Sequence, residues 1–321
     1  MNNNVKTKEI KTKLLHLLKG EFGLILILIL LCIIFAFSSP FFLTSKNLIN
    51  VTRQISIVLI VALGMLCVVL IGEIDLSVGS SAALSGMVCA WILLQSESQV
   101  LAIAGAIIAG VLIGAFNGVM IIYGKIPSFI VTLASMGILR GIVLVWSQGK
   151  SMSGLPAGFS FLGAGYIGKM IPVSSLVTLI LVGVFIFLLH KTKHGVYLKA
   201  IGSNNEAAEL SAIPVKRYKM SAFIITGVLC AIGGIIITSK LLSAQPTAGD
   251  GLEMDVLSAV ILGGASLSGG VGTVTGTVVG ALTIGIINNG MNLLKISPFF
   301  QQIVKGTIIL LAVLARRKNK N

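Results

Sequence analysis

The chain has 321 residues, of which 55% are hydrophobic and only 11% are charged. A soluble domain usually has about 25% charged residues, so this composition, with a mean hydropathy of +1.02, excludes an ordinary soluble enzyme and places most of the chain in lipid. The formal net charge of +14 comes in clusters between apolar runs, without interleaved aromatic residues, which argues against a nucleic-acid-binding face.

Ten apolar segments follow a basic tail at 1–21, and each is predicted to form a membrane helix because a span needs roughly 20 apolar residues. They are 22–38, 54–72, 77–95, 100–122, 128–147, 173–190, 220–242, 254–264, 273–292 and 299–315, and a second tail follows at 316–321. The segment 254–264 is too short to cross alone and is expected to be re-entrant or paired with irregular backbone. The predicted fold is all-α, a single polytopic transmembrane helical bundle over 22–315.

Basic residues set the orientation of this bundle, because loops rich in Lys and Arg stay on the cytoplasmic side. They cluster in the 1–21 tail, in the 191–219 loop and at 316–320. Placing both termini in the cytoplasm keeps all three clusters inside. The basic residues left outside are then Lys46, Arg53, Lys150, Lys169 and Lys295. Lys240 and Lys305 lie near predicted span ends, where long side chains reach toward the interface.

Two segments, 72–79 and 263–270, interrupt the hydrophobic pattern at membrane depth. Both fit Gly-x-x-x-Leu-Ser-x-Gly, which indicates either an internal repeat or a chance match over four positions. Broken helices in corresponding halves of a chain mark the path of a transported molecule. Glycines also recur at a spacing of four residues over 110–118 and 272–280, and this spacing predicts close packing of helices.

Covalent chemistry has little support in the sequence. The four cysteines form no CxxC pair, and the three histidines, His16, His190 and His194, lie near predicted cytoplasmic boundaries. A GxGxxG match at 163–168 follows no strand and is soon interrupted by Pro172, so it does not predict a nucleotide site. We therefore expect no catalytic residue, no metal, no cofactor and no ATP-binding loop in this chain.

Acidic residues indicate how the chain is energised. None of them lies in the middle of a predicted span, and only Glu73 and Asp75 come close, at the first break. A carrier driven by protons or sodium generally needs an embedded carboxylate. Coupling to an ion gradient is therefore disfavoured, and we expect the energy to come from a partner.

The 191–219 loop is the place where such a partner is expected to act. Its stretch 200–214 predicts a short helix that Asn204 or Asn205 caps, with acidic residues in the first turns and Pro214 after its end. A rigid helix on the cytoplasmic side transmits movement well. The alternative is an ordinary solvated loop.

Several stretches of the chain are similar to membrane permeases of bacterial ATP-binding-cassette (ABC) importers for monosaccharides, the ribose type in particular. They are 72–79, 139–141, 202–208, 243–251, 262–267 and 288–290. Glu73 and Ala212 depart from the family pattern, which more often has a small residue at the first position and usually has Gly at the second.

The resemblance implies a transport subunit in the bacterial cytoplasmic (inner) membrane, importing ribose or else xylose, allose, galactose or a signalling furanose. It implies a homodimer embedded in the lipid bilayer, a separate cytoplasmic ABC ATPase, and an extracytoplasmic sugar-binding protein. The residues that it assigns to ATPase coupling are Gly202, Asn204, Asn205, Glu206, Ala207 and Ala208. An ion-coupled secondary carrier is the alternative from another class.

For a sugar path, polar residues at helix breaks are the expected lining, because a neutral sugar needs hydroxyl and amide partners. They are Asp75, Ser77, Ser266, Ser268, Asn288, Asn289 and Asn292. The alternative is that these residues cap helices or join them by hydrogen bonds. Arg140 is the charge that lies deep in a predicted span, and it is expected to have a structural role, holding backbone carbonyls or an acid.

Overall fold

The computed structural model describes residues 21–168 and 171–317, so Lys169 and most of the two predicted tails lie outside the described residues. The long helices are α2 (Glu21–Ser38), α3 (Ser45–Leu70), α4 (Val78–Ser96), α5 (Gln99–Ile122), α6 (Ser128–Ser147), α8 (Val173–Lys191), α11 (Val215–Leu241), α13 (Val274–Leu293) and α14 (Pro298–Arg317). The shorter ones are η1 (Ala157–Ser160), α7 (Phe161–Ala164), α9 (Lys193–Ser203), α10 (Asn205–Leu210) and α12 (Leu252–Leu262). Each of the ten predicted segments overlaps one of these helices, which confirms an all-α polytopic bundle.

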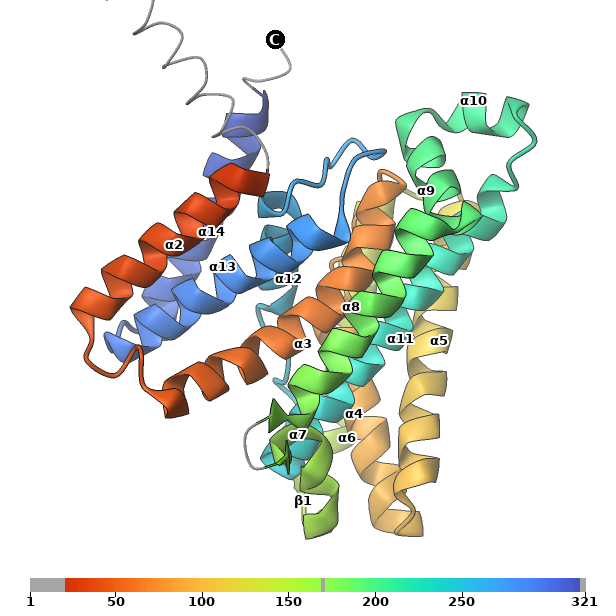
Figure 1. Ribbon diagram of the computed structural model, residues 1–321. Helices are drawn as coiled ribbons and strands as arrows, with labels where there is room; N and C mark the ends of the chain where they lie inside the picture. The colour runs from red at the N-terminus through yellow and green to blue at the C-terminus, as the bar shows by residue number, and fades with distance from the viewer. Residues whose placement is uncertain (1–20, 169–170, 318–321) are drawn as a thin grey trace, which may run out of the picture.

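Four strands of two residues each make the remaining regular structure of the described part. β1 (Met152–Ser153) pairs antiparallel with β4 (Ser243–Ala244), and β2 (Tyr166–Ile167) pairs antiparallel with β3 (Ile171–Pro172). Both strand pairs lie at the end of the bundle opposite to α10 (Figure 1). The polypeptide therefore has one end built of short strands and turns, and another end built around α9 and α10.

Seven helices of the described part are long and apolar enough to cross a membrane, namely α3, α4, α5, α6, α8, α11 and α13. A shorter apolar stretch, Gly23–Ser38, lies within α2. At 1.5 Å per residue, the 11 residues of α12 span only about 16 Å. The prediction that this segment cannot cross alone is therefore confirmed by its length.

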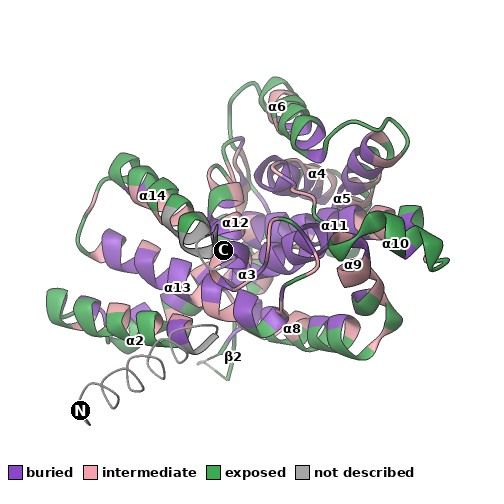
Figure 2. Ribbon diagram, turned by 90° about the horizontal axis from the view of Figure 1, so that it is seen from above, coloured by how far each residue is buried: buried purple, intermediate pink, exposed green. Residues whose placement is uncertain are grey.

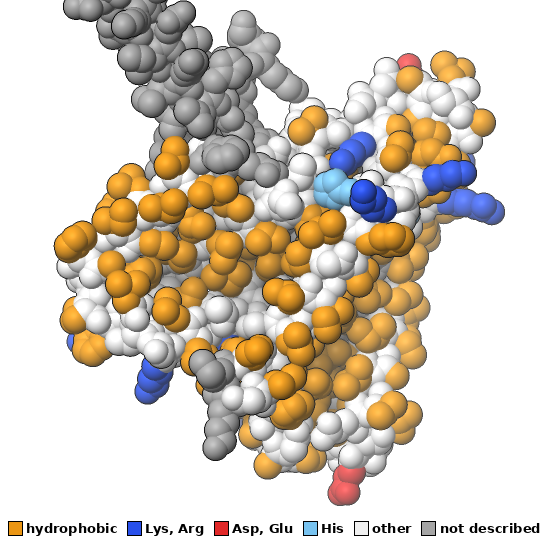
Figure 3. Space-filling view, in the orientation of Figure 1, with side chains coloured by type: hydrophobic (Ala, Val, Ile, Leu, Met, Phe, Trp, Pro, Cys, Tyr) orange, Lys and Arg blue, Asp and Glu red, His pale blue; other side chains and the backbone are white. Residues whose placement is uncertain are grey.

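Helices α3 and α11 form the buried centre, and α2, α6, α8 and α14 lie around them with largely exposed outer faces (Figure 2). Large hydrophobic side chains cover much of the outer surface, while Lys, Arg and His gather toward the end that carries α9 and α10 (Figure 3). Exposed apolar faces on helices of this length are typical of a lipid-facing surface.

The glycines at four-residue spacing allow the central helices to touch, as predicted. A methyl group on Gly114 of α5 would lie 2.8 Å from the Cα of Ile224 in α11, and one on Gly110 would lie 2.8 Å from the Cβ of Ala231. On α13, a methyl group on Gly280 would lie 2.9 Å from the nitrogen of Gly263. Small residues at these positions let backbones approach in the absence of a hydrophobic driving force between helices.

Both predicted breaks are present, and the structure brings them together. The first lies between α3 and α4, and the second lies between α12 and α13. The backbone N–H of Gly270 in the second break donates to the carbonyl of Leu70 at the first, at 2.9 Å. A methyl group on Gly72 would lie 3.5 Å from the carbonyl oxygen of Ser268. The two segments that share a sequence pattern therefore form one joint.

Candidate functional site

The short helix predicted within 200–214 is α10, which begins after Asn204 and ends before Pro214, and a helix that was not predicted, α9, precedes it. Asn204 separates them, because its φ of −160° and ψ of 108° are extended. Its Oδ1 accepts a hydrogen bond of 2.9 Å from the N–H of Ala207, so Asn204, rather than Asn205, is the cap. The side chains of Asn205, Glu206 and Ala207 are exposed.

One side of α10 is anchored and the other is free. Ala208 is buried, whereas Leu210 at the end of α10 is 90% exposed. Glu206 lies in the first turn, where a carboxylate interacts favourably with the helix dipole. Ala212 follows in the left-handed region, with φ of +58°, so the departure from the family's Gly there carries a backbone cost of roughly 1–2 kcal/mol. The result is a short, exposed and well-capped helix.

Gly202, at the end of α9, packs against both helix breaks at once. A methyl group on Gly202 would lie 2.5 Å from the nitrogen of Gly270 and closer still to the carbonyl oxygen of Leu70. A methyl group on Gly269 would lie 2.6 Å from the carbonyl oxygen of Gly202. Only one residue separates Gly202 from the cap at Asn204, so α10 begins directly beside the joint between the breaks.

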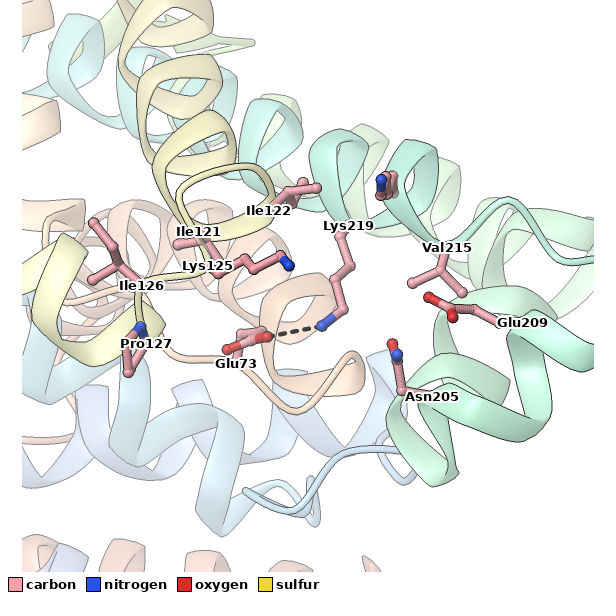
Figure 4. Close-up of a pocket in the computed structure, with 11 residues that line it drawn as sticks. Glu73, Ile121, Ile122, Lys125, Ile126, Pro127, Asn205, Glu209, Val215 and Lys219 are labelled. Atoms are coloured by element: carbon pink, nitrogen blue, oxygen red, sulfur yellow. Dashed lines mark hydrogen bonds and ion pairs between the residues drawn. The ribbon is translucent and has the colours of Figure 1, made fainter.

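A pocket of about 330 Å³ lies between α10 and the first break. It is lined by Glu73, Ile121, Ile122, Lys125, Ile126, Pro127, Asn205, Glu209, Val215, Lys216 and Lys219. Across it, the Nζ of Lys219 lies 3.0 Å from Oε1 of Glu73, and both side chains are about four-fifths buried (Figure 4). Glu73 departs from the family pattern, and its partner on α11 compensates the charge.

Asp75 and Ser77 belong to a buried polar network inside the protomer. Asp75 is 3% exposed and Ser77 is fully buried. Oδ1 of Asp75 accepts from the N–H of Ser77 at 2.8 Å and from its Oγ at 2.6 Å. Asn117 of α5 donates to Oγ of Ser77 at 3.0 Å, and its Oδ1 accepts from Ser135 of α6 at 2.6 Å. The network ties the first break to α5 and α6.

The other candidate path residues lie apart from this network. Ser266 is half-buried and Ser268 is exposed, and Oγ of Ser266 accepts from the N–H of Ser268 at 3.3 Å. Asn289 of α13 is buried and exchanges two amide hydrogen bonds with Asn47 of α3, at 2.8 and 2.9 Å. Each of these side chains therefore serves a turn or a helix pair within the protomer.

Asp255, in the first turn of α12, is a buried acid, whereas the sequence had singled out only Glu73 and Asp75 as acids close to the interior of the bundle. Lys305 of α14 lies 2.7 Å from its Oδ1 and 3.0 Å from its Oδ2, so Lys305 does not reach toward the interface as predicted. Asn288 of α13 donates to Oδ2 at 3.1 Å, and Oδ1 of Asn292 accepts from Gln301 at 2.9 Å. These contacts join α12, α13 and α14.

Comparison with known proteins identifies the class of molecule that this architecture belongs to. The family model described as "Branched-chain amino acid transport system / permease component" matches residues 47–313, which is most of the chain. The chain belongs to this family. No solved structure matches the permease.

Several relatives of the permease have sugars in their names. The ribose import permease of Bacillus subtilis (strain 168) is 44% identical over 322 residues, covering 98% of this chain and 99% of its own. The ribose import permease of Escherichia coli (strain K12) is 42% identical over 302 residues, covering 93% and 94%. The D-allose transport permease of the same strain is 37% identical over 296 residues, covering 91% and 90%.

Arg140 of the permease holds the segment between α11 and α12. Its guanidinium donates to the carbonyls of Pro246 and, at 3.0 Å, Ala248, and it lies 2.5 Å from Oδ1 of Asp250. These are the carbonyls and the acid that a buried arginine was expected to require. The structural role and a contact with cargo are both compatible with this position, because the Asp250 side chain is 60% exposed.

Sequence reasoning missed the roles of four side chains that organise the permease: Asn117, Lys219, Asp255 and Lys305. Asn117 carries a signal, because it is the strongly polar residue in the interior of an otherwise apolar helix. Lys305 carries one too, since it lies in the interior of α14 rather than at its end. No sequence signal indicates that Lys219 pairs with Glu73, because 146 residues separate the two.

Proposed function

We propose that the chain is the membrane subunit of an ABC importer that moves a monosaccharide, ribose, across the bacterial cytoplasmic membrane. Relatives named as ribose import permeases are 42–44% identical over nearly the whole chain. Relatives named for L-arabinose and D-allose are 36–39% identical. The higher identity over the full length supports ribose over these other sugars.

The observation that carries the proposal is the close packing of Gly202 against both helix breaks, next to the exposed helix α10. A separate ATPase on the cytoplasmic side would bind α10, through Asn205, Glu206 and Ala207. Only Asn204 separates α9 from α10, and no flexible loop lies between them. A displacement of α10 would therefore move α9, and with it the contacts of Gly202 with Leu70 and the second break. The chain itself would carry out no hydrolysis and would hold no cofactor.

The proposed topology has ten spans with both termini in the cytoplasm. The basic and histidine side chains around α9 and α10 support a cytoplasmic position for that end. The opposite end, with its two strand pairs, would then face the extracytoplasmic sugar-binding protein. There Arg53 lies over the ring of Tyr166, 4.2 Å from its centroid, and donates to the carbonyl of Ala164, which fastens this end to α3.

A second copy of the chain is part of the proposal, because the path would lie where two protomers meet. Contact of the cargo with Asp75 and Ser77 is a prediction that requires their network to open as the helices move. The same holds for Asn288 and Asn289, whose amides are engaged between helices. Ser266 and Ser268 lie nearer the surface and would meet cargo at the cytoplasmic exit.

The test replaces residues 205–208 by Gly-Ser-Gly-Ser in vesicles that contain the permease, its ATPase and its binding protein. The expected result is ATP hydrolysis without sugar uptake, while the melting temperature of the membrane part is unchanged. The matched control replaces the exposed turn 148–150, which follows α6 at the end of the bundle opposite to α10. This control should leave ATP hydrolysis and ATPase binding intact. Uptake at the wild-type rate after the 205–208 replacement would refute the docking assignment.

Two further arms of the same assay separate the rival functions. Labelled ribose, xylose, allose and galactose, each with its own binding protein, identify the sugar. An ion-coupled carrier predicts uptake that collapses with an ionophore while ATP is held constant. The buried Asp255 does not favour this rival, because Lys305 neutralises it.

A further inference from the structure

The segment 243–251 is irregular backbone that Arg140 fixes in place. It begins as β4, paired with β1, and ends at the start of α12. Besides the Arg140 contacts, a methyl group on Gly249 would lie 2.6 Å from the carbonyl oxygen of Gly79 in α4. The segment is therefore pressed against α4 and α6 and is not a free loop.

The arginine that holds this segment starts from the interior of a long apolar helix. Within α6 (Ser128–Ser147), Arg140 is about 18 Å from the first residue and about 10 Å from the last at 1.5 Å per residue. The hydrocarbon core of a bilayer is about 30 Å thick. Because α6 is itself about 30 Å long, the backbone of Arg140 lies inside that core, and the residues that its guanidinium holds lie within one side-chain length of it.

One face of this assembly is polar and uncovered by the protomer. The side chains of Arg140 and Asp250 are 19% and 60% exposed, and Thr247 is exposed beside them. Gly137 and Gly141, on either side of Arg140 in α6, have no atom within 4 Å of the place where a methyl group would be. By contrast, the exposed residues of α8 include Leu179 at 71% and Ile180 at 58%.

Lipid cannot cover that polar face, because the face consists of irregular backbone and charged side chains. Non-helical backbone at membrane depth is tolerated only where protein covers it or a water-filled cavity meets it. Charged side chains in a membrane face the bundle interior or an aqueous cavity. The apolar α8 face suits lipid, whereas the face made by segment 243–251 and Arg140 requires water or a second protein surface.

We propose that segment 243–251 and the Arg140–Asp250 pair line the aqueous path of the sugar, and that this pair hydrogen-bonds its hydroxyl groups. The exposed carboxylate of Asp250 accepts from hydroxyls, and the guanidinium has five N–H donors, more than its protein partners use. A polyhydroxylated neutral molecule presents donors and acceptors together, as this pair does. This inference rests on the proposed sugar transport and assigns its contact site to Arg140 and Asp250.

The test measures thiol labelling by a charged methanethiosulfonate reagent in vesicles containing the full transporter. The starting variant replaces Cys32, Cys67, Cys89 and Cys230 by Ala. Thr247→Cys probes the proposed path, and Leu179→Cys is the matched control on the exposed face of α8. Labelling of Thr247→Cys should be at least about tenfold faster, because only the thiolate reacts and lipid suppresses its formation.

Sugar contact is tested in the same vesicles with ribose, and with leucine at equal concentration as the control solute. Ribose, and not leucine, should slow labelling of Thr247→Cys, and adding Asp250→Asn should abolish that protection without slowing the labelling itself. Labelling no faster than at Leu179→Cys would overturn the aqueous path, since lipid or a dry contact with a second copy then covers the face. Fast labelling that ribose does not slow would overturn the sugar contact.

The outcome is separable from the proposed function. The cysteine-free transporter must take up ribose with ATP; if it does not, while ATPase and permease remain assembled, the proposed function fails whatever the labelling shows. Labelling that contradicts the path, in vesicles that do transport ribose, rejects only the assignment to segment 243–251 and Arg140.

Discussion

Replacement of Gly202 by Ala tests the joint between α9 and the two breaks. The added methyl group would lie 2.5 Å from the nitrogen of Gly270 and nearer to the carbonyl oxygen of Leu70. Both are backbone atoms, which cannot turn aside as a flexible side chain can, so α9 must retreat by roughly 1 Å to restore an ordinary contact distance. The change adds one carbon at a residue within a helix, so it leaves the capping at Asn204 untouched.

The magnitude follows from two opposed effects. Overpacking of this kind costs about 1–3 kcal/mol, and Ala in place of Gly in a helix returns about 1 kcal/mol. The balance is a net loss of up to about 2 kcal/mol, which lowers the population of the packed arrangement by a factor of up to about 30. Because this arrangement links α10 to both breaks, sugar uptake per ATP hydrolysed should fall, while the bundle stays folded.

The assay combines hydrogen exchange with transport. Exchange at the Gly270 amide, which donates to Leu70, should accelerate in Gly202→Ala, and uptake per ATP should decrease in the reconstituted complex. Gly183→Ala is the matched control, since it lies within α8 and a methyl group there meets nothing within 4 Å. If the Gly270 exchange rate and the uptake per ATP are the same in Gly202→Ala and Gly183→Ala, the packing of α9 against the breaks has no part in transport.

Three further outcomes follow from single contacts. Asn204→Ala removes the cap of α10 and should destabilise that helix by about 0.5–2 kcal/mol. Hydrogen exchange at the amides of 205–210 measures this loss, and unchanged protection there would contradict the capping role. Lys305→Met leaves Asp255 buried and unpaired, which should cost about 3–5 kcal/mol in unfolding from detergent micelles. The double variant with Asp255→Leu should recover most of this, and equal loss in both variants would argue against the ion pair. Burial lowers the pKa of His194 below its ordinary value of 6.5. As the pH falls, the unfolded chain therefore binds a proton at His194 before the folded chain does, and stability should decrease below about pH 6.5. His194→Phe should flatten this pH dependence of the melting temperature, and an identical dependence in the variant would refute the prediction.

Much of the fold could be predicted from the sequence because lipid imposes a strong local pattern. The ten apolar runs overlap helices, and Asn204 caps a helix as residues of its type do at such positions. The exception is α9 (Lys193–Ser203), which was not predicted because its basic and apolar residues alternate without a continuous apolar run. Local patterns also predicted the packing glycines of α5 and α13.

The candidate site was less accessible, because its parts meet only through tertiary contacts. The two breaks share a pattern, yet nothing local indicates that Gly270 bonds to Leu70, or that Gly202 lies between them. The partners of charged residues were hidden for the same reason: Asp255 and Lys305 are 50 residues apart. A sequence shows that a charge at membrane depth needs a partner, but the fold decides which one.

The account's central claim is that this subunit moves sugar only when a partner ATPase drives it through α10. The most direct measurement compares sugar accumulation in vesicles containing the purified subunit alone with vesicles that also contain the ATPase and the binding protein. We predict ATP-dependent accumulation in the complex, insensitive to ionophores, and none with the subunit alone. Accumulation against a gradient by the subunit alone would contradict the account.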